Sequence, residues 1–177
     1  MIKYYAKVFF FTGILFFVGI LVTSLPGMTK RQAVIHALAS GLLFGVTLAL
    51  TVGTVHVLKV RKAAGGDPAA DIYATTQSRT FRTALEYERL FTAVTHYLSE
   101  TAGFTLTEKD YDKGRITALS PFNIITFGSR ITVLLEKNPG GPAEVKIVSR
   151  PRLSTILADY GENLRIVAAF EKHLRAL

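Results

Sequence analysis

The sequence predicts an α+β membrane protein, in which a two-helix transmembrane hairpin precedes a two-layer α/β domain. Two long stretches near the N-terminus, residues 8–28 and 33–58, contain no charged residue. Each is long enough to cross the hydrocarbon core of a bilayer, which takes about 20 apolar residues in a helix. Beyond them the apolar residues recur with periods of 2 and 3.6, which is typical of strands and of helices packed on a sheet.

Positive charge is concentrated beside the two apolar stretches. The formal net charge is +8, but residues 71–177 contribute only +2, from 14 Lys and Arg against 12 Asp and Glu. Basic residues that flank apolar spans are typical of membrane proteins. A nucleic-acid-binding surface needs a basic stripe on the folded domain, and this sequence has none. We therefore expect membrane lipids, and no nucleic acid, as the surroundings of these charges.

The basic residues also predict the orientation in the membrane. The two outer flanks hold more of them than the connecting loop does: Lys3, Lys7, Lys59, Arg61 and Lys62 against Lys30 and Arg31. Basic flanks favour the cytoplasmic side, so we expect both termini and the folded domain in the cytoplasm, at the inner membrane. A cleaved signal peptide ending near residues 22–24 is the alternative for the first stretch. The second span that follows directly favours the hairpin.

The second stretch carries a small-residue ridge, with one small residue at every fourth position: Ala37, Gly41, Gly45, Ala49 and Gly53. Residues four apart lie on nearly the same face of a helix. Small side chains let another helix backbone approach closely in lipid. The sequence leaves two partners for the ridge open, the first span of the same chain or a neighbouring subunit of a homo-oligomer.

A polar stripe lies on the same predicted helix and comprises His36, Ser40, Thr47, Thr51 and Thr54. These residues fall within about 60° on a helical wheel with 100° per residue. Hydroxyl groups in membrane helices commonly bond to carbonyls one turn earlier. A row of them can also line a water-filled pore, so both interpretations stay open.

The remaining chain is expected to form a linker at residues 63–77 and a folded domain at residues 78–177, after the hairpin of residues 1–62. Alternating patterns predict strands at 79–85, 104–107, 115–119, 130–136 and 143–148, turns at 112–114 and 138–142, and a pairing or bulged segment at 124–127. Helical spacing predicts amphipathic helices at 86–101, with Gly103 as its stop, and at 162–177. The order β-α-β-β-β-β-α predicts an antiparallel sheet with both helices on one face.

The end of the chain carries a recognisable pattern. Ser149, Arg150 and Arg152 lie at a strand end, and Asp159, Gly161 and Asn163 follow before the last helix. This segment resembles the closing part of uncharacterised bacterial domains of unknown function, which end in Ser-Arg/Lys-x-Arg/Lys, an Asp-x-Gly-x-Asn turn and an amphipathic helix. Residues 113–118, 131–133 and 145–147 resemble theirs too. The resemblance covers residues 78–176 and implies this α/β fold but no activity.

Three residues of that segment have a structural interpretation. Asp159 is suited to cap the last helix or to close an Asx turn. Gly161 supplies a backbone angle that other residues resist. Asn163 is suited to bond to neighbouring backbone groups. We therefore expect these three residues to form a structural turn.

Two arginines of the segment form a candidate anion site. Arg150 and Arg152 are two residues apart on a strand, so their side chains point the same way. Together with Arg165 they are candidate contacts for a lipid headgroup or a phosphate. The alternative is that they are solvated, or paired with Asp159 and Glu162.

The sequence shows no signature of an enzyme. It has no cysteine, no Gly-rich phosphate loop, no His-x-x-x-His pair and no nucleophile elbow. We expect no catalytic, cofactor or metal site, and a non-enzymatic integral membrane protein that acts as a homo-oligomeric scaffold or as an interaction module, with a protein partner at its cytoplasmic domain. Two alternatives are a small oligomeric channel or mechanosensitive-type pore, and a domain that binds a lipid or amphiphile at the membrane surface.

Overall fold

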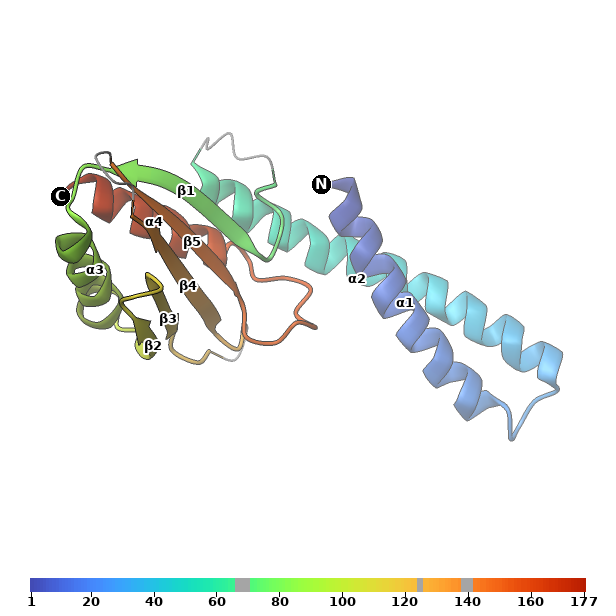
Figure 1. The fold of residues 1–177 in the computed structure, drawn as a ribbon. Helices are drawn as coiled ribbons and strands as arrows, with labels where there is room; N and C mark the ends of the chain where they lie inside the picture. Colours follow the sequence, from blue (N-terminus) through green and yellow to red (C-terminus); the bar gives the residue numbers. More distant parts are fainter. Residues whose placement is uncertain (66–70, 124–125, 138–141) are drawn as a thin grey trace. The chain divides into compact units, whose positions relative to one another are not determined.

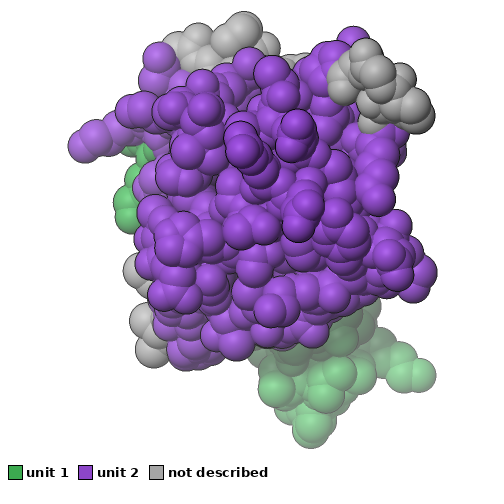
Figure 2. All heavy atoms as spheres, turned by 60° about the vertical axis from the view of Figure 1, so that its left-hand side comes forward, with its two compact units in different colours: residues 1–59 green, residues 60–177 purple. Residues whose placement is uncertain are grey.

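The computed structural model describes residues 1–65, 71–123, 126–137 and 142–177. The chain divides into two compact units, residues 1–59 and residues 60–177, which Figure 2 colours separately. The two units differ in secondary structure, since the first is helical and the second contains the sheet (Figure 1). The fold class is therefore α+β, as predicted.

The first unit is a pair of long apolar helices packed together. Helix α1 spans Ile2–Ser24 and helix α2 spans Lys30–Ala64, with α2 continuing into the second unit. Both helices are long and apolar enough to cross a membrane. Helix α2 begins with a capping box, because Gln32 N–H donates to Thr29 Oγ1 at 3.4 Å and Thr29 N–H donates to Gln32 Oε1 at 3.2 Å. This reciprocal pair satisfies two backbone donors at the start of α2.

Helix α2 extends beyond the predicted span at both ends. Its 35 residues correspond to about 52 Å at 1.5 Å per residue, against about 30 Å for a hydrocarbon core. The basic residues Arg61 and Lys62, which follow the predicted span, lie in the last turn of α2. Lys and Arg are good helix formers and complement the negative end of the helix dipole, so a charged flank does not end the helix.

The second unit contains a five-stranded antiparallel sheet. The strands are β1 (Gln77–Thr83), β2 (Thr105–Asp110), β3 (Arg115–Leu119), β4 (Ser129–Glu136) and β5 (Ala143–Pro151). Their order across the sheet is β1-β5-β4-β3-β2 (Figure 1). Strand β1 therefore pairs with the last strand, and the remaining neighbours are consecutive in the chain. The predicted element order is confirmed.

One face of the sheet carries the hydrophobic core. Alternate residues of the central strands, such as Ile131 and Ile147, are fully buried there. They form one cluster with residues of helix α3 (Tyr87–His96) and helix α4 (Glu162–Arg175). The buried residues of these two helices in the cluster are Leu90, Val94, Val167, Phe170 and Leu174, and Tyr97 and Leu98 follow directly after α3. Both helices thus cover the same face, as the alternation predicted.

The predicted helix at 86–101 consists of two parts. Helix α3 ends at His96 and continues as a π-helical turn, η1 (Tyr97–Thr101). Gly103 follows with φ of 67°, and Phe104 N–H donates to the Leu98 carbonyl at 2.8 Å. Gly103 therefore ends the helix, because its left-handed backbone turns the chain into β2. The widening into a π turn leaves no trace in the apolar periodicity.

Strands β2, β4 and β5 are longer than the sequence patterns indicated, and β3 has the predicted bounds. Strand β1, at 77–83, begins and ends two residues before the predicted 79–85. Some predicted segments are not described. Strand β2 continues to Asp110, beyond the predicted end at residue 107. A bulge at Thr107 shifts its register against β3 and breaks the alternation from which the strand was predicted. Strand β5 reaches Pro151, beyond the predicted end at residue 148. Part of the predicted linker (66–70), part of the segment at 124–127 (124–125) and part of the turn at 138–142 (138–141) lie outside the described residues.

Candidate functional site

The small-residue ridge of α2 lies against α1 of the same chain. A Cβ atom on Gly41 would stand 2.8 Å from the Gly13 carbonyl oxygen, and one on Gly45 would stand 2.9 Å from the Phe9 carbonyl oxygen. Two further ridge residues are buried: Ala37 is fully buried, and Ala49 is almost fully buried. Backbone therefore packs directly on backbone, which is how small residues associate helices in lipid.

Aromatic rings extend this interface toward the start of α1 and also lie beside the glycine contacts. The Tyr5 ring covers Gly53, where an added Cβ would stand 2.7 Å from Tyr5 Cε1. The rings of Tyr4 and His56 stack with centroids 4.3 Å apart, and those of Phe16 and Phe44 with centroids 4.1 Å apart. Glycine on one helix and aromatic side chains on the other are thus complementary in shape.

The polar stripe uses its hydroxyl groups within the hairpin. Thr47 Oγ1 donates to the Leu43 carbonyl at 2.9 Å, and Thr51 Oγ1 donates to the Thr47 carbonyl at 2.8 Å. Two other stripe residues contact α1: the Thr54 hydroxyl lies 3.2 Å from that of Tyr5, and His36 Nδ1 lies 3.2 Å from Ser24 Oγ. Ser40 is half-buried. The Thr47 and Thr51 hydroxyls therefore use their one donor within their own helix.

The turn before α4 is a compact polar joint inside the second unit. Asp159 is buried, and it accepts hydrogen bonds from the Gly161 N–H at 3.2 Å and from the Asn163 N–H at 3.0 Å. Asn163 Oδ1 in turn accepts a hydrogen bond from Ser149 Oγ at 2.5 Å. Gly161 has φ of 79°. These contacts tie the end of β5 to the start of α4.

The last turn of α2 packs on this joint. A Cβ atom on Gly161 would stand 3.3 Å from the Val60 Cα and 3.2 Å from the Ala63 Cβ. Val60 is fully buried, and Arg61 Nε donates to the Tyr73 hydroxyl at 3.0 Å. Glycine at position 161 thus serves both the left-handed backbone and the close approach of α2.

The three candidate anion-binding arginines do not meet at one place. Arg152 donates to the Ser120 carbonyl, which directs its side chain toward the loop between β3 and β4. Arg150 lies beside Arg130 on the sheet face opposite α4, because the preceding Ser149 points to Asn163 on that helix. Arg165 lies on α4 itself. The sheet therefore separates Arg150 from Arg165.

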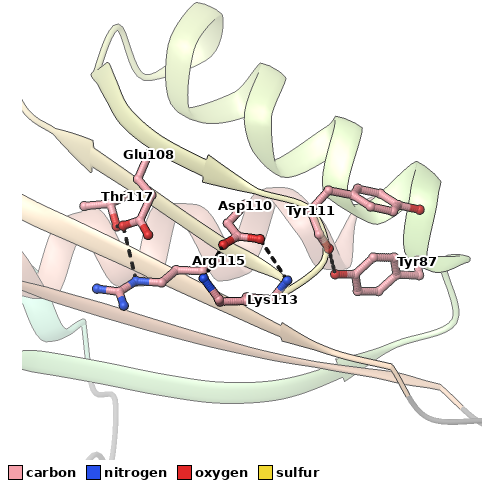
Figure 3. Close-up of polar contacts among 7 residues, drawn as sticks. All are labelled: Tyr87, Glu108, Asp110, Tyr111, Lys113, Arg115 and Thr117. Atoms are coloured by element: carbon pink, nitrogen blue, oxygen red, sulfur yellow. Dashed lines mark hydrogen bonds and ion pairs between the residues drawn. The ribbon is translucent and has the colours of Figure 1, made fainter.

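An aromatic and cationic cluster at the end of the β2–β3 hairpin was not found by sequence reasoning. Figure 3 shows Tyr87 of α3 beside the turn between β2 and β3, where its hydroxyl donates to the Tyr111 carbonyl at 2.7 Å. The ammonium of Lys137 stands 4.3 Å from the centre of the Tyr87 ring and 5.2 Å from that of Tyr111. Gly114, with φ of 62°, lies under the Tyr87 hydroxyl. Only the Asp-Lys-Gly turn signal was visible in the sequence.

Two ion pairs join oppositely charged side chains on the β2–β3 hairpin. Lys113 Nζ lies 2.9 Å from Asp110 Oδ2, and Arg115 Nε lies 3.3 Å from Glu108 Oε2 (Figure 3). The backbone N–H of Lys113 and then its ammonium group lower the pKa of Asp110, and Asp110 raises the pKa of Lys113. Partial burial, reinforced by Tyr111 and nearby carboxylates, raises the pKa of Tyr87. The Lys113–Asp110 ion pair is therefore maintained at neutral pH.

A surface groove of about 430 Å³ lies next to this cluster. It is lined by residues of α3, η1, β2 and the turn after β2: Phe91, Thr92, Thr95, His96, Ser99, Glu100, Lys109 and Tyr111. Thr95 and Ser99 bond to carbonyls one turn back, at 2.8 and 3.0 Å. Tyr111 is exposed, and its ring meets that of Phe91 edge to face. Aromatic surface beside mixed charge suits contact with a polypeptide more than with a small anion.

The comparisons with known proteins leave the family open. No protein-family model matches the chain, and no curated protein matches it. Among solved structures it is similar to "Crystal structure of Ara h 8.0201", at 13% identity and a TM-score of 0.31, over 58% of this chain and 98% of that one. A likeness at that score carries no argument about this chain. The resemblance to uncharacterised bacterial domains therefore stays a prediction.

Proposed function

We propose that this chain is a non-enzymatic integral membrane protein, in which the α1–α2 hairpin anchors the α+β domain at the cytoplasmic face as an interaction module. One observation carries the proposal. The hairpin buries glycine and alanine and exposes large apolar side chains, including Ile14, Leu15, Leu43 and Leu50. In water such a surface would associate or aggregate, whereas in lipid it is solvated and the small residues drive the packing.

The groove between α3 and β2 supports the interaction role of the domain. It joins exposed aromatic surface at Tyr111 to charged residues of both signs, Lys109 and Glu100. Aromatic residues are enriched at protein interfaces and charged residues at their rims. The space between sheet and helices is filled by fully buried side chains such as Ile116 and Phe170, so the proposal does not place a lipid there.

Assembly of several copies stays a prediction. The ridge is covered by α1 within one chain, so a homo-oligomer would use other faces of the hairpin or the groove. A pore has no specific support in the contacts of Thr47 and Thr51, whose hydroxyls bond within their own helix.

Thiol labelling of a chain that contains no natural cysteine tests the anchoring and orientation. Gly27→Cys marks the loop between the helices, and Ser154→Cys marks the domain; both positions are exposed. In intact cells a membrane-impermeant maleimide should label the loop and reach the domain only after permeabilisation. The reverse pattern would overturn the orientation. Release of the protein from membranes by alkaline carbonate would overturn the anchoring.

The same labelling series tests the interaction role. Thr92→Cys lies in the groove, and Thr80→Cys, exposed on β1, is its control. If a partner covers the groove, labelling at position 92 should be slower in native membranes than in purified protein, with no change at position 80. Equal rates in the two preparations at both positions would contradict a partner at the groove.

A further inference from the structure

An apolar hollow lies on the hairpin beside the point where the two backbones touch. Its volume is about 240 Å³, and it is lined by Phe9, Phe10, Gly13, Ile14, Phe17, Leu38, Gly41 and Leu42. For scale, an engineered apolar cavity of about 150 Å³ holds a benzene molecule. Gly13 and Gly41 form the floor, and Phe10, Ile14 and Leu42 form an exposed apolar rim.

A basic residue lies on the same face of α1, toward its N-terminus. Lys3 precedes Phe10 by seven residues and Ile14 by eleven, which places all three within about 40° on a helical wheel. Lys3 is exposed, and among the described residues it makes no ion pair. From Lys3 to Gly13 the helix rises about 15 Å. That equals half of a hydrocarbon core of about 30 Å, the depth that the acyl chains of one leaflet fill.

The rim decides between the two occupants that a membrane offers. Another helix needs small residues along the line of contact to bring its backbone close. Here the small residues lie at the floor, while bulky Phe10, Ile14 and Leu42 project around them. A flexible acyl chain can enter between such side chains, whereas a second helix would be held away.

We propose that this hollow holds one acyl chain of an anionic phospholipid, whose headgroup lies at Lys3 in the leaflet on the N-terminal side. The inference rests on the proposed anchoring of the hairpin in a membrane. Anionic headgroups are attracted by basic residues at the membrane surface, and an apolar hollow would otherwise face lipid with unfilled contacts along its walls. The lipid would thus fill the seam between α1 and α2.

The test uses a single tryptophan in a chain that naturally has none. The full-length Phe10→Trp variant is placed in phosphatidylcholine bilayers that contain a minor fraction of brominated phosphatidylglycerol or of brominated phosphatidylcholine. Bromine quenches indole fluorescence on contact. The anionic lipid should quench about fivefold more effectively, which corresponds to about 1 kcal/mol for one basic residue near an anionic group. Ile14→Trp is a second reporter on the rim.

Matched variants separate the possible results. Leu43→Trp lies at a similar depth on an exposed side outside the hollow, and both lipids should quench it equally. Adding Lys3→Gln should remove the preference at position 10, and Lys30→Gln, at the start of α2, should not.

Three results would overturn the proposal in different ways. Equal quenching of the Phe10→Trp variant by both lipids would remove the anionic selectivity. Quenching at position 43 without quenching at positions 10 and 14 would show that protein, such as a second copy, covers the hollow. If no position is quenched by either lipid, the hairpin is not in the bilayer, and the proposed anchoring fails as well.

Discussion

The two units of this chain bury opposite kinds of side chain. The hairpin buries mostly small residues of α2, such as Ala37 and Gly41, together with a few larger ones such as Val8 and His56, and it exposes leucine and phenylalanine. The α+β domain buries large residues, such as Ile147 and Phe170, and places charged residues on its surface. In water, apolar burial stabilises a core roughly in proportion to its area. Between helices in lipid that driving force is missing, and close backbone contact takes its place.

The largest effect should come from emptying the core of the domain. Phe170→Ala removes a fully buried ring that meets Phe81 and Tyr97 edge to face, and should lower the free energy of unfolding by about 3–5 kcal/mol. Leu43→Ala removes an exposed side chain of the hairpin, and should stay within about 0.5 kcal/mol. Urea unfolding of the full-length protein in a mild detergent measures both. Similar losses of unfolding free energy for the two variants would contradict the contrast between a large-residue core in the domain and exposed large residues in the hairpin.

An intermediate effect should come from adding volume to the hairpin. Gly41→Leu introduces a Cβ 2.8 Å from the Gly13 carbonyl oxygen, so the helices must separate; overpacking of this kind typically destabilises by about 1–3 kcal/mol. A short bifunctional thiol reagent between Phe16→Cys and Phe44→Cys, whose native rings stack, should then join the two helices in lower yield.

Gly19→Leu is the matched control for that variant, because nothing lies within 4 Å of an added Cβ there. Its cross-linking yield should equal that of the parent chain. If Gly41→Leu instead leaves the intrachain yield unchanged and lowers the native mass in detergent, the ridge is a surface between subunits.

The smallest effect should be a pH dependence confined to the exposed hairpin of the domain. The pKa of Asp110 is lowered in the folded state, so its contribution to stability is present above the ordinary value of 3.8 and is lost as the pH falls through the folded value. The pKa of Lys113 is raised, so its contribution is lost only above about 10.5. Unfolding of the wild type and of Asp110→Ala should differ by a small constant amount between these limits and converge in acid. Asp112→Ala removes a carboxylate from the adjacent turn and is the matched control.

Sequence patterns predicted the fold well where one face of an element is buried. Strand β4 alternates cleanly, with Ile131 and Val133 inward, and α4 shows an apolar stripe, so both were placed within about two residues. The strand predicted at 104–107 ended three residues before β2 does, because the bulge at Thr107 reverses the alternation of the following residues. The capping box at Thr29 and Gln32 corresponds to a Thr-x-x-Gln pattern, which is a local signal for the start of a helix.

The small-residue ridge and the arginines show which contacts the sequence could not predict. The spacing of Gly41 and Gly45 establishes that some backbone comes close, because only small residues repeat at one helical face. It does not say which backbone, and only the contact with Gly13 and Phe9 answers that. Similarly, Arg150 and Arg165 are close in the chain, but the sheet lies between them, since Ser149 points to α4.

The sequence by itself determined the hydropathy, the periodicity and the turn chemistry of this protein, and through them its α+β class and its two apolar spans. These are local properties, because a residue and its neighbours within a few positions decide them. Only the tertiary structure decided the partner of the ridge, the cluster of Tyr87, Tyr111 and Lys137, and the hollow beside Gly13. Each joins segments that are distant in the chain, and such contacts depend on how whole elements pack rather than on any local pattern.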